Sequence, residues 1–144
     1  MATVLNILEF KGTDVVTCGP GDTVLHAARV MNEHGIGAVV VVEGKQVVGI
    51  FTERDVMRRV VAAGMDAERT LLHDVMTKGV ITCAPDTRID ECRAIITARR
   101  IRHLPIVAVG ALRGIVTSGD VLAQELREQR EALDYLNSWA SSGR

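Results

Sequence analysis

A Thr-x-x-Asp pattern occurs twice in this sequence of 144 residues, as Thr52 to Asp55 and as Thr117 to Asp120. Each copy lies where a β-rich run gives way to a helical pattern. One interpretation is a capping box, in which the Thr and Asp side chains satisfy free N–H groups of the first helical turn. The other is a binding site, because a helix N-terminus donates N–H groups to phosphate and a carboxylate can accept both hydrogen bonds of a ribose diol. Capping and binding can coexist, so the pattern leaves both interpretations open.

The residue before each aspartate differs between the two copies, being Arg54 in the first and Gly119 in the second. Arg54 could reach a phosphate, or it could be solvated. Glycine in the first turn of a helix costs about 1 kcal/mol relative to alanine. Gly119 is therefore either a tolerated substitution without a role or a position that a ligand or a neighbouring backbone approaches closely.

The strongest local charge cluster is residues 99–103, which read Arg-Arg-Ile-Arg-His. The first two arginines suit the C-terminal end of a helix, where cations interact favourably with the helix dipole. Arg102 and His103 differ because they lead directly into the next β-rich run. Arginine binds phosphate bidentately and histidine can donate a hydrogen bond. The equivalent residues of the first copy, Gly37 and Ala38, carry no charge, so two sites built in this way are chemically unequal.

These features belong to an internal repeat with an offset of 65 residues. Identical pairs include Thr17 with Thr82, Cys18 with Cys83, Pro20 with Pro85, Ile36 with Ile101, Gly49 with Gly114, and Val56 with Val121. A fixed period of this kind indicates repeated structural units. Each copy is too small to bury its own faces, so we expect the two to pack together as one pseudo-symmetric module.

Each copy is predicted to form a β-α-β-β-α unit, which makes the fold class α/β. The expected strands are 15–18, 38–42 and 47–51 in the first copy, and 80–83, 104–109 and 112–116 in the second. Asp22 and Thr87 are candidate N-caps of the intervening helices, and Thr87 and Asp90 have the spacing of a capping box. Gly35 is a plausible C′ residue at the end of the first of these helices.

Along the chain we expect a first repeat with an N-terminal lead-in at 1–64, a linker at 65–74, a second repeat at 75–125, and a C-terminal helix and tail at 126–144. The last helix should run to about Trp139. Its apolar stripe consists of Val121, Leu122, Leu126, Leu133, Leu136 and Trp139. A stripe of this size needs a cover, which is either the module itself or a second subunit.

Composition argues against several classes of protein. A net charge of −1 and an aromatic content of 3% weaken the case for nucleic-acid binding. The longest apolar run, 38–42, is too short to cross a bilayer, and the N-terminus lacks the regions of a signal peptide. The three cysteines form no C-x-x-C pair, so we expect reduced, buried thiols and a cytoplasmic protein rather than a disulfide between Cys18 and Cys83.

Enzymatic signatures are missing from the sequence. Gly35-x-Gly37 lacks the third glycine of a dinucleotide fingerprint, and there is no P-loop or nucleophile elbow. The four histidines show no metal-ligand spacing with one another or with the cysteines. We therefore expect no catalytic residues, no catalytic cofactor and no metal site.

The ordered segments of the two copies resemble a tandem pair of CBS domains, a family named after cystathionine β-synthase. The resemblance is carried by residues 36–41 with 49–55 and by 102–107 with 114–120, and it spans about residues 5–125. It implies a regulatory module that binds adenosine-containing ligands (AMP, ADP, ATP, NAD or S-adenosylmethionine) in clefts between the repeats. It also implies association into a flat dimeric disc, as in bacterial CBS pairs described as signal-transduction proteins.

The resemblance further implies roles for particular residues. The ribose and phosphate contacts fall on Thr52, Asp55, Thr117, Asp120, Arg102 and His103, with Arg54 and Gly119 beside them at the helix starts. In the similar family part of the opening strand edge lines the adenine pocket, which here means Val16, Thr17, Ile81 and Thr82. These four residues are equally well explained as core residues.

The expected function is ligand sensing, in which a bound adenine nucleotide favours one conformation of a homodimer or its contact with a regulated protein. The sequence does not name that protein, and we expect neither nucleic acid nor a membrane as a partner. The alternative is a structural or interaction protein with vestigial clefts, in which the terminal helix makes the contacts. Nucleotide carried by the purified protein would separate the two.

Overall fold

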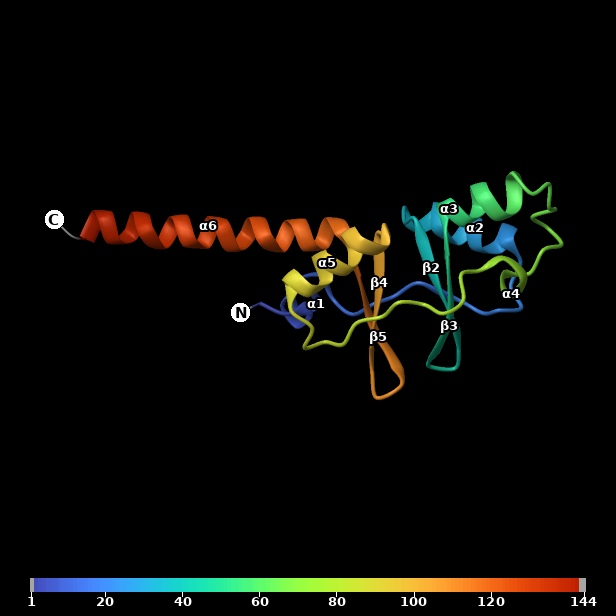
Figure 1. The fold of residues 1–144 in the computed structure, drawn as a ribbon, viewed down its shortest axis with the longest axis horizontal. Helices are drawn as coiled ribbons and strands as arrows, with labels where there is room; N and C mark the ends of the chain where they lie inside the picture. Colours follow the sequence, from blue (N-terminus) through green and yellow to red (C-terminus); the bar gives the residue numbers. More distant parts are fainter. Residues whose placement is uncertain (1, 143–144) are drawn as a thin grey trace.

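The computed structural model describes residues 2–142 and places two α/β units side by side, with a long C-terminal helix that extends beyond them (Figure 1). In chain order the elements are α1 (Val4–Lys11), β1 (Thr17–Cys18), α2 (Val24–His34), β2 (Ala38–Glu43), β3 (Gln46–Thr52), α3 (Glu53–Asp55), the π-helical segment η1 (Val56–Val61), α4 (Leu72–Val75), α5 (Ile89–Arg99), β4 (His103–Ala108), β5 (Ala111–Thr117) and α6 (Ser118–Ser142). The α/β fold with two repeats is therefore confirmed.

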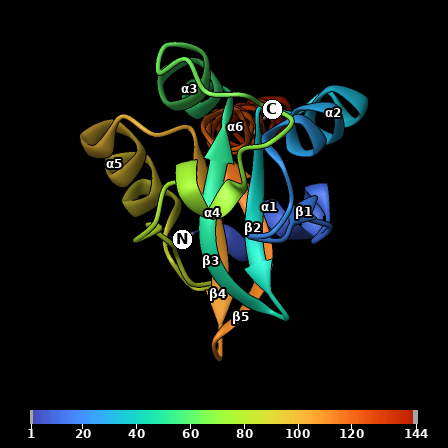
Figure 2. The ribbon, with the colours of Figure 1, turned by 90° about the vertical axis from the view of Figure 1, so that its right-hand side faces the viewer.

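The strands form one small sheet in each repeat. In the first repeat β1 pairs parallel with β2, and β2 pairs antiparallel with β3. In the second, β4 and β5 form the equivalent hairpin, and both hairpins shift register at the same place, after Val41 and after Ile106. Figure 2 shows one hairpin in front of the other. The Leu112 N–H near the start of β5 donates to the carbonyl of Lys45, in the turn of the first hairpin, at 3.0 Å.

Each repeat has its own apolar core, and each core is completed by the segment that precedes the other repeat in the sequence. The first core contains Phe51 and Val39 together with residues 72–76, which include α4. The second contains Leu104 together with residues 4–8 of α1. The N-terminal lead-in, which sequence order joins to the first repeat, therefore packs in the second.

Three equivalent backbone hydrogen bonds attach each lead-in. They are Val4 N to Thr87 O, Leu5 N to Pro85 O and Ile89 N to Ala2 O in the second repeat, and Leu72 N to Asp22 O, His73 N to Pro20 O and Val24 N to Thr70 O in the first. This shared pattern fixes where the chain emerges from each lead-in. The residues that follow, Lys11 and Thr77, are thereby directed toward the interface between the repeats.

Two glycines at equivalent strand positions permit this packing. A Cβ on Gly49 would lie 2.8 Å from Met76 Cγ, and a Cβ on Gly114 would lie 2.8 Å from Leu8 Cδ2. Both distances are below normal van der Waals contact. Glycine is needed because the lead-in side chains sit directly on the strand backbone.

The helix ends confirm some of the sequence-based expectations and correct others. Gly35 ends α2 in the left-handed conformation, as expected. The N-cap of α2 is Thr23 rather than Asp22, and the N-cap of α5 is Arg88 rather than Thr87. The carboxylate of Asp22 and the hydroxyl of Thr87 instead accept from the loop N–H groups of Gly19 and Ala84. The predicted caps are therefore wrong by one residue, because their side chains close the preceding turn.

The opening strands are shorter than predicted. In the first repeat β1 spans only Thr17–Cys18, and in the second the predicted strand 80–83 reduces to a single bridge between Cys83 and Ile106. All three cysteines are free and buried, as predicted.

The terminal helix α6 runs to Ser142, beyond the expected end near Trp139. Val121 is buried, whereas Leu122, Leu126, Leu133, Leu136 and Trp139 are each more than half exposed, at 59%, 55%, 61%, 61% and 61%. Most of the predicted stripe is therefore not covered by its own module. No helix within the described residues 2–142 has the length and apolar character needed to span a membrane.

Candidate functional site

Two clefts lie between the repeats, and each is built from a helix start of one repeat and a strand start of the other. The first cleft has a volume of about 250 Å³. It is lined by Gly37, Ile50, Thr52, Glu53, Arg54, Asp55, Thr77, Arg100, Ile101, Arg102 and His103. The structure therefore brings Thr52, Asp55 and Arg54 of the first repeat together with Arg102 and His103 of the second.

The second cleft has a volume of about 430 Å³. Its first-repeat residues are 14–16 and 35–38, and its second-repeat residues are Ile115, Thr117, Ser118 and Gly119, with Lys11, Arg102 and His103 completing the wall. Arg102 and His103 thus line both clefts. Asp120 belongs to the same helix start but is reached from the cleft through Lys11.

The two helix starts have the same local geometry. In the first repeat Asp55 Oδ2 accepts from Thr52 N–H at 3.0 Å, and Thr52 Oγ1 accepts from Asp55 N–H at 3.3 Å. In the second, Asp120 Oδ2 accepts from Thr117 N–H at 2.9 Å, and Thr117 Oγ1 accepts from Asp120 N–H at 3.1 Å. The capping-box interpretation is therefore confirmed in both repeats. It leaves one oxygen of each carboxylate outside the cap.

A backbone hydrogen bond also ties each helix start to the strand start of its own repeat. The Glu53 N–H donates to the Gly37 carbonyl at 3.0 Å, and the Ser118 N–H donates to the Arg102 carbonyl at 2.9 Å. In each repeat the donor is the first residue of the helix, and the acceptor is the residue directly before the first strand of the hairpin, β2 or β4. The positions of Gly37 and Arg102 at the cleft wall are therefore set by backbone contacts rather than by flexible side chains.

The aspartate of the first cleft is buried and held by neutral and charged partners. Asp55 is 7% exposed. Its two oxygens lie 3.3 and 3.4 Å from Thr77 Oγ1, which donates to them, and Arg59 Nε lies 3.5 Å from Oδ1. Thr77 also donates its backbone N–H to the Ile50 carbonyl at 2.9 Å. Thr77, which follows α4, therefore makes hydrogen bonds to both strand β3 and Asp55.

In the second cleft a lysine side chain makes both of these contacts. Lys11 Nζ donates to the Ile115 carbonyl at 3.1 Å and lies 2.6 Å from Asp120 Oδ2. Ile115 and Asp120 are the repeat equivalents of Ile50 and Asp55. An ammonium therefore replaces the neutral backbone and hydroxyl groups of Thr77. The sequence analysis missed Lys11 and Thr77, because their contacts depend on how the lead-ins are exchanged between the repeats.

His103 is half-buried in the wall that the two clefts share. Burial lowers its pKa below the ordinary value of 6.5, and the charge of Arg102 lowers it further. A neutral imidazole can still donate one hydrogen bond, while the guanidinium of Arg102, which is exposed to solvent, supplies the fixed positive charge. The shared wall thus combines one permanent cation with one neutral donor.

Arg54 and Gly119 give the helix starts different shapes. Arg54 Nη1 donates to the Arg100 carbonyl at 3.1 Å, so its side chain bridges the two repeats across the first cleft. A Cβ on Gly119 would meet only Thr117 Oγ1, at 3.6 Å. No protein backbone crowds Gly119 in the described structure, so the glycine leaves open space at the second cleft.

The four residues expected at an adenine pocket lie in different surroundings. Val16 is half-buried and lines the second cleft. Thr17 and Thr82 are exposed, and Ile81 packs against the second core. None of these three is among the residues that line either cleft. Their assignment to an adenine pocket stays a prediction.

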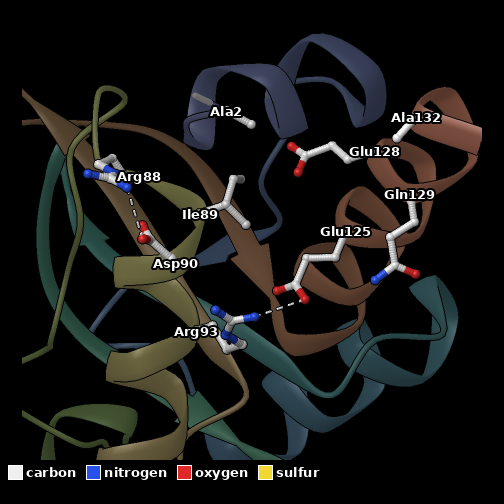
Figure 3. Close-up of a pocket in the computed structure, with 9 residues that line it drawn as sticks. All are labelled: Ala2, Arg88, Ile89, Asp90, Arg93, Glu125, Glu128, Gln129 and Ala132. Atoms are coloured by element: carbon white, nitrogen blue, oxygen red, sulfur yellow. Dashed lines mark hydrogen bonds and ion pairs between the residues drawn. The ribbon is translucent and has the colours of Figure 1, made fainter. Parts of the chain in front are cut away.

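A third hollow, of about 390 Å³, lies on the far side of the second repeat between α5 and α6 (Figure 3). Four of its charged side chains form two ion pairs, Arg93 with Glu125 at 3.0 Å and Arg88 with Asp90 at 3.1 Å. The first pair joins α5 to α6, and the second lies at the start of α5. We therefore assign the hollow a structural role.

Outside the clefts, the structure brings together three side chains of metal-ligand type. The Cys18 thiol, the Asp22 carboxylate and the His26 ring place their ligand atoms within 4.8 Å of one another. The sequence analysis expected no metal-ligand spacing between a histidine and a cysteine, so this cluster was not predicted. The three residues belong to a strand end, a loop and a helix start, so their proximity depends on the loop conformation.

Comparison with known proteins agrees with this architecture. The sequence profile described as "CBS domain" matches residues 9–62 and 72–126. The chain is 33% identical over 150 residues to the CBS domain-containing protein CBSX3, mitochondrial, of Arabidopsis thaliana, an alignment that covers 98% of this chain and 73% of the relative.

Solved structures show the same fold. The CBS-domain containing protein ATU1752 from Agrobacterium tumefaciens superposes with a TM-score of 0.81 at 38% identity, covering 86% of this chain and 99% of that one. CBSX2, solved in complex with AMP, superposes with a TM-score of 0.75 at 18% identity, covering 90% of this chain and 99% of that one. At the lower identity the likeness concerns the fold alone.

Proposed function

The chain belongs to the CBS domain family, as a tandem pair, and we propose that its two clefts bind adenine nucleotides and act as a regulatory sensor. The observation that carries the proposal is the facing arrangement in the clefts. In the first cleft a capped helix start with Asp55 stands on one side, and Arg102 with His103 of the other repeat stands on the other. In the second cleft the helix start at Thr117, Arg102 and His103 face residues 35–38 of the first repeat. Ribose and phosphate are separate groups of one ligand, and this arrangement offers separate partners for each.

The chemistry of each partner fits the part of the nucleotide that it would contact. Asp55 and Asp120 accept hydrogen bonds, as a ribose diol requires, and Arg102 offers a bidentate contact to phosphate. CBSX2, which has the same fold, is solved with AMP. That likeness makes AMP the first ligand to test. The proposal itself rests on the aspartate and arginine side chains of this chain.

The clefts are proposed to differ in the number of phosphates that they accept. The second cleft is larger, contains Lys11 and has Gly119 where the first has Arg54. More space and an additional cation favour ADP or ATP there, whereas the smaller first cleft fits AMP. Binding at either cleft would draw the two repeats together and favour one arrangement of the module.

Identification of carried nucleotide tests the proposal. The protein is purified rapidly, denatured with acid, and the released small molecules are identified by mass spectrometry. We expect AMP, ADP or ATP in an amount comparable to the protein. Protein that carries no adenine species, and that also fails to bind AMP, ADP or ATP when these are added, would leave the structural or interaction role as the better account.

We also propose that the protein is a homodimer in which α6 contributes to the interface. Five large apolar side chains of the α6 stripe are more than half exposed, and they recur along the helix at spacings of three, four and seven residues. Pairing of two copies about a two-fold axis would cover each stripe with its counterpart. Light scattering should give a dimer at micromolar concentration, and truncation after Asp120 should give monomer or aggregate. A monomeric full-length protein, with or without nucleotide, would contradict the dimer.

A further inference from the structure

We infer that the first repeat contains a binding site for a zinc-class transition-metal ion, formed by Cys18, Asp22 and His26. The site stands apart from the nucleotide proposal, since none of its three residues lines either cleft. It combines a sulfur ligand at the end of β1, an oxygen ligand in the loop that follows, and a nitrogen ligand in the first turn of α2.

The ligand atoms are already close to the required geometry. Donors around a tetrahedral zinc ion, at about 2.0–2.3 Å from the metal, lie about 3.6 Å from one another. In this structure the three ligand atoms all lie within 4.8 Å of one another. Side-chain rotations that move each atom by about 1 Å would therefore complete three positions of a tetrahedron. Water can occupy the fourth.

The backbone holds the three residues in place before any metal arrives. Cys18 ends β1, where it pairs with Val41 in the sheet. The loop that follows is fastened by Leu72 and His73, whose N–H groups donate to the Asp22 and Pro20 carbonyls at 2.9 and 3.0 Å. Because these bonds come from a separate lead-in segment, the loop cannot open without disturbing the first core.

The side chains retain the capacity to bind a metal. Asp22 Oδ2 accepts from the Gly19 N–H at 2.7 Å, which orients the carboxylate and leaves Oδ1 available. The His26 backbone N–H donates to Thr23 Oγ1 at 3.1 Å, fixing the first turn of α2. Within the described residues the His26 ring makes no hydrogen bond, and this side chain is exposed.

The donor set favours zinc or cobalt over calcium or magnesium. Thiolate and imidazole are ligands of borderline and soft ions, whereas calcium and magnesium take oxygen ligands. Burial, and then the charge of Asp22, raise the pKa of Cys18 to about 11, so the free thiol carries a proton. Metal binding displaces that proton to solvent and replaces it with a sulfur–metal bond.

The second repeat provides an internal comparison. The equivalents of Cys18, Asp22 and His26 are Cys83, Thr87 and Glu91. The Cys83 thiol takes part in side-chain hydrogen bonds with Cys92 and Thr87, and no imidazole stands at the helix start. The same backbone frame therefore carries a hydrogen-bonded thiol in one repeat and a set of metal ligands in the other.

Titration of the metal-stripped, full-length protein with Co²⁺ tests the inference. Tetrahedral cobalt with a thiolate ligand gives visible d–d bands and a near-ultraviolet sulfur-to-cobalt charge-transfer band. We expect both to saturate at one Co²⁺ per chain and to disappear when Zn²⁺ is added. Absence of the charge-transfer band from folded protein would overturn the site.

Variants assign the bands to residues. Cys18→Ser should abolish the charge-transfer band, while Cys83→Ser, the buried equivalent in the other repeat, should retain it. Asp22→Asn preserves the acceptor for Gly19 and should weaken Co²⁺ binding by at least about ten-fold. Because His26 is exposed, His26→Gln should fold normally and weaken binding similarly, whereas His34→Gln, on the same helix, should have no effect. A band that survives Cys18→Ser, or an affinity unchanged by His26→Gln, would contradict the inference.

Discussion

The first and second clefts share a backbone frame and differ in what holds the helix-start aspartate. Asp55 is buried and bonded by the Thr77 hydroxyl at 3.3 Å, whereas Asp120 is more open and paired with the Lys11 ammonium at 2.6 Å. The aspartate side chains are 9% and 23% exposed, respectively. The repeat thus conserves the position of the carboxylate while changing the charge beside it.

This difference shows how a repeated fold can produce two unequal sites. The bonds that place the lead-ins and the helix starts are backbone bonds, which tolerate changes of side chain. Charge at the cleft is set by a few side chains that those bonds position, among them Lys11, Arg54 and Arg102. Symmetry of the frame therefore does not imply symmetry of binding.

The largest effect is expected from Arg102, because it lines both clefts. Arg102→Ala should weaken AMP binding by about ten- to a hundred-fold, the loss expected for a charge-assisted hydrogen bond. Adenosine has no phosphate, so its binding should change little. Calorimetry with both ligands measures the difference, and Arg99→Ala, an exposed arginine outside the clefts, is the control. Equal losses for AMP and adenosine would place Arg102 outside the phosphate site.

The aspartates should each affect one cleft. Asp55→Ala and Asp120→Ala should each weaken binding at their own cleft by about ten-fold or more, since an acceptor for the ribose is lost. Asp55→Ala should also lower stability more, because Asp55 is buried among Thr52, Thr77 and Arg59. Asp86→Ala, at an exposed loop, is the control. A double variant with unchanged affinity and stoichiometry would show that both residues are caps only.

A smaller effect, specific to the second cleft, is expected from Lys11. Lys11→Met removes a cation from that cleft, so ATP binding should weaken by a few-fold relative to AMP, as expected for a partly exposed charge. Lys78→Met is a suitable control, because Lys78 is exposed and does not line a cleft. Competition between ATP and AMP gives the ratio directly. A ratio that stays at the wild-type value would mean that the clefts do not differ through Lys11.

The smallest effect concerns pH and His103. Its pKa is lowered by burial and by Arg102, so below pH 6.5 the unfolded chain binds a proton more readily than the folded protein. Stability should therefore fall as pH drops below 6.5, and His103→Gln should reduce that fall. Urea unfolding at about pH 7.5 and about pH 5 measures both proteins. An identical loss of stability in the variant would assign the pH dependence to other groups.

The parts of the fold that follow a local pattern could be predicted from the sequence. The two hairpins and the Thr-x-x-Asp helix starts follow the apolar periodicity, and the left-handed end of α2 follows from Gly35. The N-caps at Thr23 and Arg88 could not be predicted in this way. The polar residues one position earlier, Asp22 and Thr87, accept hydrogen bonds from the preceding turn instead of from the helix. Choosing between neighbouring polar residues requires the loop conformation, which the sequence pattern does not specify.

The contacts that make the clefts unequal could not be predicted. Lys11 and Asp120 are 109 residues apart, and they meet only because α1 packs in the second core. Sequence order suggested the opposite, since α1 precedes the first repeat. The similarity between Lys11-Gly12 and Lys78-Gly79 hinted at a shared role for the lead-ins. That similarity pairs Lys11 with Lys78. In the structure, however, Lys11 makes the contacts with strand and aspartate that Thr77 makes in the other cleft.

Calorimetric titration of nucleotide-stripped, full-length protein with AMP tests the central claim most directly. The account predicts saturable binding that Arg102→Ala weakens by about ten-fold or more, with ATP competing for at least one of the clefts. Folded protein that gives no saturable heat with AMP, ADP or ATP would contradict it, and the clefts would then be structural features of a module that acts through its surface.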